Sequence, residues 1–244
     1  MQWHMSILPR IHAYLPAATI LEIAPGYGRW TQFLKEQCKS LIVVDLMERC
    51  IDACKERFKA DTHIQYHVND GTSLAMVPDR SVDFLFTYDS LVHVEKDVIG
   101  DYLKQLANKL TPNGVGFIHH SNIGDFNEHF AWADRLPRGR GILSRWRLVE
   151  AGDHRRAKSM TADVFLSLAS TAGLKVITQE IITWQTLRPI DCFSVITQPG
   201  SIWDRDLRRL VNKDFDRETA YIKKLSMLYD PQMNGEKAGA PKEA

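Results

Sequence analysis

The stretch Thr19-Ile20-Leu21-Glu22-Ile23-Ala24-Pro25-Gly26-Tyr27-Gly28 decides the fold of this chain. Its apolar beginning predicts a buried strand over residues 19–24, and a helix is expected over residues 29–38. Because glycine has no Cβ, the backbone of the loop between them can approach a ligand closely, and the helix start offers free N–H groups. The stretch therefore predicts a ligand-binding turn between a strand and a helix.

Strands and helices alternate beyond this turn. Further strands are expected over residues 40–46, 63–68, 82–88 and 114–120, and helices over residues 48–59 and 97–110. Near-continuous apolar strands that alternate with helices indicate a parallel sheet covered on both faces.

The second half of the chain has a different pattern. A helix capped by Thr161 is expected to run to Ala172 and to end at Gly173, before two β-rich runs, 174–184 and 192–198, that suit a hairpin. Residues 203–228 are expected to form one helix or two short ones. The predicted fold is α/β and doubly wound, with a mostly parallel seven-stranded sheet and a terminal antiparallel hairpin.

We predict one domain over residues 1–229, with an insertion or lid on the acceptor side over 122–158 and a disordered tail over 230–244. The net charge of +1 gives no bulk attraction to nucleic acid or to an anionic membrane. No apolar run is long enough to span a bilayer, and the start of the chain does not have the pattern of a signal peptide. The four cysteines include no CxxC pair, which favours free thiols and a cytoplasmic location.

Three acidic positions accompany the glycine loop. Glu22 lies just ahead of the loop, Asp45 ends the second predicted strand, and Asp70-Gly71 follows the third. A carboxylate in the place of Asp45 can accept both ribose hydroxyl hydrogen bonds. Thr31 occupies the third glycine position of the GxGxxG fingerprint, so a nicotinamide dinucleotide is a less favoured alternative.

These residues resemble those of the class I, Rossmann-like methyltransferases that use S-adenosylmethionine (SAM). The resemblance covers residues 19–121, and the predicted hairpin matches the closing strands of that family. It implies SAM as cofactor, with Gly26 and Gly28 at its amino-acid end and Glu22 just ahead of them. It also implies Asp45 at the ribose and Asp70-Gly71 at the adenine. Asp89 and Ser90 would then lie beside the methyl group.

Histidines follow two of the predicted strands. A hydroxyl acceptor needs a general base, and histidine suits that role at neutral pH. We expect His120 or His119 to be the base, with Asp89 or His93 as an orienting partner. Side chains alternate along a strand, so His119 and His120 should point to opposite faces, with one of them at the site. His154, in the insertion, is a further candidate.

A divalent metal, Mg²⁺, is a second way to activate a hydroxyl. The possible ligands are Asp89 and His120, with Glu95, His119 and Asp125 as further candidates. No spacing among these residues decides for or against a metal.

The acceptor is predicted from what the chain lacks and from a second resemblance. The segment Thr87-Tyr88-Asp89-Ser90 has no proline, unlike the motif of DNA amino-methyltransferases, so nucleic acid is not an expected partner. The tract from Asp89 to Asn122 looks like bacterial methyltransferases of glycan and polysaccharide biosynthesis, and more loosely like those that methylate mycobacterial polysaccharides. That resemblance implies O-methylation of a sugar or polysaccharide-precursor hydroxyl by in-line displacement. A small phenolic or amine acceptor, a non-catalytic SAM-binding subunit and a homo-oligomer stay open.

Overall fold

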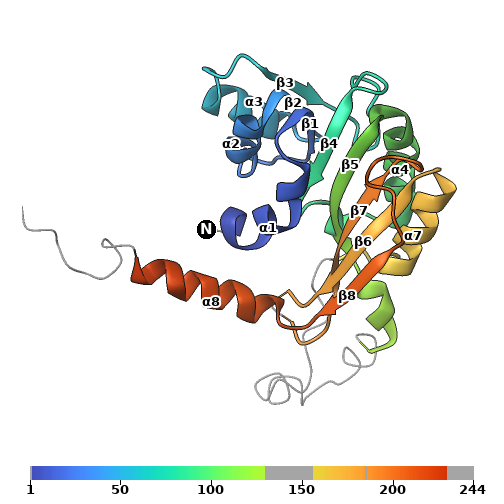
Figure 1. Cartoon of the computed structure of the whole chain (residues 1–244). Coiled ribbons are helices and arrows are strands. Elements are labelled where there is room, and N and C mark those ends of the chain that lie inside the picture. Colours follow the sequence, from blue (N-terminus) through green and yellow to red (C-terminus); the bar gives the residue numbers. More distant parts are fainter. Residues whose placement is uncertain (1, 130–155, 185, 230–244) are drawn as a thin grey trace, which may run out of the picture.

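The computed structural model describes residues 2–129, 156–184 and 186–229. Within these residues one eight-stranded sheet runs in the order β3-β2-β1-β4-β5-β7-β6-β8 (Figure 1). The strands are β1 (Ala17–Ile23), β2 (Cys38–Asp45), β3 (Ile64–Val68), β4 (Val82–Thr87), β5 (Leu110–Ser121), β6 (Lys175–Ile182), β7 (Asp191–Thr197) and β8 (Arg208–Asn212).

The first five strands are parallel to one another, as the alternation predicts. Strand order reverses at β1, which lies between β2 and β4. Ligands of open parallel sheets bind beyond the carboxyl ends of the strands at such a switch point. The glycine loop follows β1, so the predicted ligand-binding turn lies at that point.

The predicted hairpin is confirmed as β6 and β7, which pair antiparallel. β7 inserts between β5 and β6 and pairs antiparallel with β5, so that Ser121 faces Asp191 across the ladder. This pairing brings the start of β7 to the carboxyl end of β5.

The prediction of seven strands is wrong by one. Residues 208–212 form β8 parallel to β6, where helix was expected. Leu210 and Val211 are 60% and 48% exposed, so β8 is an edge strand without a buried face. Backbone pairing with β6 holds these residues in strand form, and α8 (Phe215–Leu228) follows them.

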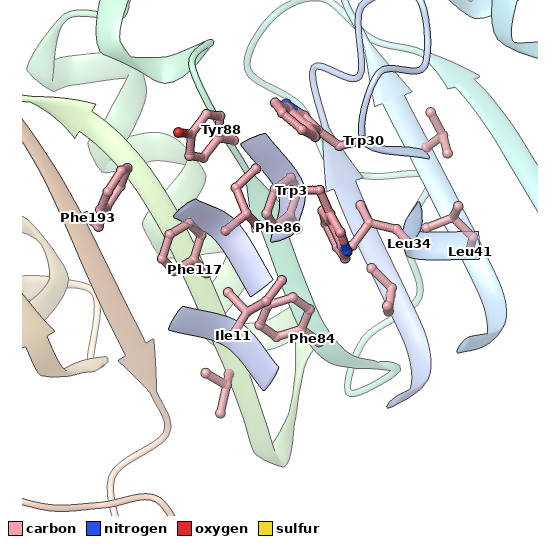
Figure 2. Packing of buried hydrophobic residues seen from close by; sticks show 14 of the residues in the cluster. Trp3, Ile11, Trp30, Leu34, Leu41, Phe84, Phe86, Tyr88, Phe117 and Phe193 are labelled. Carbon is pink, nitrogen blue, oxygen red and sulfur yellow. The ribbon is translucent and has the colours of Figure 1, made fainter. Parts of the chain in front are cut away.

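Helices cover both faces of the sheet, as predicted. α4 (Lys96–Lys109) and α7 (Ala162–Thr171) place Leu103 and Phe165 in one core cluster with Leu85 of β4. On the other face lie η1 (Trp3–Ile7), α1 (Leu8–Ile11), α2 (Thr31–Leu34) and α3 (Glu48–Arg57). Figure 2 shows Trp3 packed between Leu34 and Phe86 on this face.

Two helix predictions differ in outcome. The helix expected over residues 29–38 is a single α-helical turn, α2, and a short 3₁₀ segment over Lys35–Gln37. The cap at Thr161 is confirmed, because its Oγ1 accepts a hydrogen bond from the Val164 N–H over 3.0 Å.

Most of the predicted insertion and all of the predicted tail lie outside the described residues. Among the described residues, no helix has the length and apolar character needed to cross a membrane.

Candidate active site

The glycine loop combines an open position with a packed one. Gly26 has φ +56°, and a Cβ built on it would meet no atom within 4 Å. Gly28 has φ +76°, and a Cβ there would lie 2.5 Å from the Phe58 ring at the end of α3. Both glycines are therefore needed for their backbone conformation, but Gly26 alone borders space that a ligand can enter.

Glu22 lies under this loop with 1% of its surface exposed. Its Oε2 accepts a 2.6 Å hydrogen bond from the Thr31 hydroxyl, and its Oε1 has no partner among the described residues. Burial raises the pKa of Glu22 to about 8, and the nearby Asp45 adds to the rise. The carboxyl group is therefore protonated at neutral pH, as expected for a carboxyl without a cationic partner in the core.

Asp45 connects the ends of β1 and β2. Its Oδ2 accepts from the Gly26 N–H over 3.2 Å, and its Oδ1 accepts from the Met47 N–H over 2.8 Å. The side chain thus serves the turn into α3 and also lies against the open glycine. This is the place where the sequence predicts a ribose-binding carboxylate.

Asp70 is exposed and serves a turn. Its Oδ1 accepts hydrogen bonds from the Ser73 and Thr72 N–H groups and from the Thr72 hydroxyl. These bonds, that of Ser73 foremost, hold the pKa of Asp70 below its ordinary value. Gly71, at φ +90°, lies against Leu46, the residue that follows β2.

Ser90 joins the loop after β4 to the glycine loop. Its hydroxyl donates to the carbonyl of Ala24 over 3.1 Å. Ala24 and Asp89, on either side of this bond, both have φ +59°, a left-handed conformation that is unfavourable for residues with a Cβ. Strained backbone of this kind persists where surrounding contacts hold it, and it gathers at functional sites.

A polar network holds the Asp89 turn in place. The Asp89 N–H donates to Nδ1 of His119 over 3.1 Å. Because Nδ1 accepts, the proton of the neutral ring is on Nε2, which lies 3.5 Å from Oδ2 of Asp191. Arg156 binds Asp191 through two 2.9 Å hydrogen bonds and lies 3.8 Å from Asp89. Asp89, His119, Asp191 and Arg156 form what we call the Asp89 network.

Charge balance explains the buried part of this network. The side chains of His119 and Asp191 are fully buried, whereas Asp89 is 40% exposed. Burial alone would raise the pKa of Asp191, but His119 and Arg156 outweigh that effect and hold the pKa below its ordinary value. An ionised Asp191 therefore neutralises Arg156 inside the protein. Asp89 is the most exposed member of the network.

His120 lies on the other face of β5, as the alternation predicts. It is fully buried and stacks on Phe165 of α7 at 4.2 Å between ring centroids. Its Nδ1 contacts the Ser121 carbonyl over 2.9 Å, and its Nε2 contacts the Ser194 hydroxyl over 2.8 Å. Burial lowers the pKa of His120 to about 3. These contacts make it a core residue, which does not favour the expected role as base.

The remaining catalytic candidates are dispersed. His93 ends the short 3₁₀ segment Leu91–His93 and is exposed, and His154 lies outside the described residues. Glu95 accepts hydrogen bonds from the N–H and hydroxyl of Ser159, and Asp125 is exposed in the short 3₁₀ segment Ile123–Phe126.

The metal site that the sequence left open is not supported. In the part of the chain that the structure describes, no group of three or more histidine, cysteine, aspartate and glutamate side chains could hold a metal. His120 packs under α7 against Phe165, whereas the turn that carries Asp89 is bonded to His119, which points to the other face of β5. Asp89 also has a cation, Arg156, 3.8 Å away. The four cysteines are free, as expected.

Sequence reasoning missed Asp191 and Arg156. Asp191 precedes the predicted strand 192–198 and is the first residue of β7, and its place beside Ser121 follows only from the pairing of β7 with β5. Arg156 was one of several basic residues in the insertion, without a signal to distinguish it.

An aromatic wall encloses His119. The rings of Phe193, Tyr88 and Trp184 lie 4.7, 5.0 and 5.5 Å from the His119 ring, between centroids. Figure 2 shows Tyr88 between Phe193 and Trp30. The Gln2 amide closes the outer side, because it donates to the Tyr88 hydroxyl over 3.2 Å. Burial raises the pKa of Tyr88 well above its ordinary value, so its hydroxyl stays protonated.

Comparisons with known proteins concern the first half of the chain and the fold. Residues 20–114 match a family model described as a methyltransferase domain. Phosphoethanolamine N-methyltransferase 3 of Arabidopsis thaliana is 27% identical over 117 residues, which cover 46% of this chain and 24% of that protein. Phosphoethanolamine N-methyltransferase 1 of Triticum aestivum is 28% identical over 119 residues, with the same coverage. The match thus spans about a quarter of the length of these curated relatives.

Solved structures share the fold. A SAM-dependent methyltransferase from Clostridium acetobutylicum has a TM-score of 0.59 at 13% identity, and covers 82% of this chain and 92% of its own. The N-methyltransferase NodS from Bradyrhizobium japonicum has a TM-score of 0.55 at 17% identity, over 82% and 96% of the two chains. NodS in complex with S-adenosyl-L-homocysteine also matches, with a TM-score of 0.53 at 16% identity, over 81% and 92%. Residues 20–114 thus resemble a methyltransferase domain, and the described part of the chain has the Rossmann-like fold of SAM-dependent methyltransferases.

Proposed function

We propose that this protein transfers the methyl group of SAM to a hydroxyl of a small saccharide acceptor, with Asp89 as the residue that receives the acceptor proton. The observation that carries the proposal is the placement of Asp89. Ser90 ties its turn to the Ala24 carbonyl in the glycine loop, and His119 holds its N–H from β5. A carboxylate held between the cofactor loop and the end of β5 is suited to orient an acceptor.

The residues at the carboxyl ends of β1 and β2 fit SAM. Gly26 offers open space beside its backbone, and Asp45 places a carboxylate within 3.2 Å of that glycine's N–H. SAM, when bound, supplies an activated methyl group on a sulfonium. We assign the amino-acid end of SAM to Gly26 and its ribose to Asp45, while Gly28 shapes the loop through its packing against Phe58.

Each member of the Asp89 network has its own role in this proposal. Asp89 accepts a hydrogen bond from the acceptor hydroxyl and takes its proton as the new O–C bond forms. His119 is a positioning residue, because its Nδ1 is occupied by the Asp89 N–H and its Nε2 faces Asp191. Arg156 and Asp191 anchor the other side of the turn.

An amine acceptor is the second candidate. Both curated relatives are named as phosphoethanolamine N-methyltransferases, and NodS is named as an N-methyltransferase. An amine needs less assistance from a base than a hydroxyl does, so Asp89 would then act mainly by orienting the nitrogen. The two candidates differ in the atom that carries the methyl group in the product.

A SAM-consumption assay over saccharides and small amines, phosphoethanolamine included, tests the proposal. We expect a methylated saccharide, with the new methyl group on oxygen by NMR, and loss of turnover in Asp89→Asn. The chelator EDTA should leave turnover unchanged, because the described residues hold no metal cluster. Methylated amines as the products would establish the second candidate. S-adenosyl-L-homocysteine binding without turnover on any acceptor would instead favour a non-catalytic subunit.

A further inference from the structure

A groove lies between the N-terminal helical segment η1 and α8. It has a volume of about 460 Å³. Trp184 and Phe215 line it, together with Met5 and Ser6 from η1 and Thr219 from α8. Figure 1 shows α8 passing beside the N-terminal helices on its way out from the sheet.

We propose that this groove binds a saccharide ring of the acceptor, an inference that rests on the proposed function. Trp184 is half-buried, and its ring is stacked on the buried ring of Phe215, 5.6 Å away at an interplanar angle of 26°. The face of a sugar ring is largely apolar C–H and packs against such aromatic surfaces, while its hydroxyls need polar partners. The groove supplies both kinds of surface.

Polar groups of the groove are placed for a neutral ligand. The Ser6 side chain is fully buried, and its hydroxyl has no hydrogen-bond partner among the described residues. A buried hydroxyl without a partner is unfavourable, and a ligand hydroxyl would satisfy it. Asp216 and Lys223, also in the lining, carry opposite charges. The groove therefore has no excess of one charge that would select an ionic ligand.

The two walls of the groove are tied together. Arg10 of α1 forms an ion pair with Glu180 of β6 and lies 5.2 Å from the centre of the Phe215 ring. The side-chain amide of Asn212 donates to Glu180 over 2.8 Å from the other side. These contacts hold the N-terminal helices, β6, β8 and the start of α8 in one arrangement. The groove is therefore a preformed site, as ligand pockets usually are.

The groove adjoins the Asp89 network through shared residues. Trp184 contributes to both, since its ring lies 5.6 Å from Phe215 and 5.5 Å from His119. Gln2, in the lining, donates to Tyr88 in the wall around His119. A ring bound on Trp184 would thus lie next to the end of the sheet where Asp89 is placed. The second wall of the groove is α8, which directly follows β8, the strand that was not predicted from the sequence.

The test measures saccharide binding to the full chain separately from catalysis. Methyl α-D-glucopyranoside, maltose and chitobiose are titrated, with saturation-transfer NMR and tryptophan fluorescence as readouts. We expect binding of at least one of them, and binding at least tenfold weaker in Ala220→Trp, which fills the groove from α8. Tyr221→Trp adds an indole at the next position of the same helix, which is outside the groove lining and where Tyr221 is 64% exposed, and this variant should bind like the parent.

Measuring the binding of S-adenosyl-L-homocysteine distinguishes failure of the proposed function from failure of the groove proposal. This binding should be unchanged in both variants, because α8 packs against η1 and supplies none of the contacts described for the glycine loop. Failure of the parent chain to bind S-adenosyl-L-homocysteine would refute the proposed function. Normal binding of that ligand with no saccharide bound, or with saccharide binding unaffected by Ala220→Trp, would overturn the groove proposal. Stronger binding of p-cresol than of any saccharide would also overturn it. Should Ala220→Trp fail to fold, Thr219→Leu serves as the second variant.

Discussion

The main-chain N–H of Asp89 donates a hydrogen bond to Nδ1 of His119, 3.1 Å away, and Asp89 holds a φ of +59°. The side chain of His119, near the end of β5, thereby stabilises the unfavourable backbone conformation of Asp89, which follows β4. The position of the Asp89 carboxylate depends on this bond.

His119→Leu should remove the bond and lower kcat by about a hundredfold, the scale expected when a reacting group is displaced by about 1 Å. The dissociation constant of S-adenosyl-L-homocysteine should change little. His119→Asn should recover part of kcat, because its side-chain oxygen can accept from the Asp89 N–H. Equal loss in the leucine and asparagine variants would show that His119 acts by proton transfer instead of positioning. Steady-state kinetics and calorimetric titration provide the measurements.

His120→Leu should behave in the opposite way. Its ring fills the space over Phe165 and pairs with Ser194, so its replacement should lower the free energy of unfolding by about 1–3 kcal/mol. We expect kcat of the folded enzyme to stay within about threefold of the parent, because the residue does not face the site. Denaturant unfolding and kinetics on the same preparation test this. A collapse of kcat with unchanged stability would restore His120 as the base.

Asp191→Asn should lower the free energy of unfolding by up to about 3–5 kcal/mol, because it removes the buried carboxylate that pairs with Arg156 and leaves only the half-exposed Asp89, 3.8 Å away, to balance that charge. The lowered pKa of Asp191 means that its stabilisation is present above the ordinary pKa of an aspartate and is lost as pH falls through the folded-state value. The variant should therefore show a flatter loss of stability in acid. The double variant Asp191→Leu, Arg156→Met should recover part of the loss, since it buries no charge. Thermal melts from pH 3 to pH 7 would check both points.

Glu22→Gln should stabilise the protein at alkaline pH. The pKa of Glu22 is about 8 in the folded protein against 4.5 ordinarily, so folding favours the protonated form and stability falls as pH rises from 4.5 to 8. Glutamine keeps an acceptor for the Thr31 hydroxyl and has no charge to bury. At about 1.4 kcal/mol per pKa unit, the gain should reach a few kcal/mol above pH 8 and vanish near pH 4. Melting curves that shift equally at all pH values would contradict the assignment.

Gly26→Ala and Gly28→Ala should separate binding from folding. Both have positive φ, so each alanine should cost about 1 kcal/mol or more in backbone strain. A methyl at Gly26 enters open space and should weaken S-adenosyl-L-homocysteine binding more than tenfold. At Gly28 it meets Phe58 at 2.5 Å and should reduce stability by a further 1–3 kcal/mol. If Gly26→Ala bound the ligand normally, the cofactor would not approach that side of the loop.

Much of the fold could be predicted because its signals are local. The apolar run before Gly26, the cap at Thr161 and the two β-rich runs each depend on neighbours in the chain, and each produced the expected element. β8 had no such signal. With Leu210 and Val211 exposed, its residues show no alternation of buried and exposed side chains, and only its pairing with β6 makes it a strand.

The candidate site divides in the same way. The sequence by itself determined that a glycine turn follows a buried strand, and that His119 and His120 point to opposite faces of β5, because φ preferences and strand alternation act over a few residues. Only the tertiary structure decided that His120 packs under α7 while His119 holds Asp89. It alone also brought Asp191 to Arg156, since a buried charge selects its partner by proximity in space and not by distance along the chain.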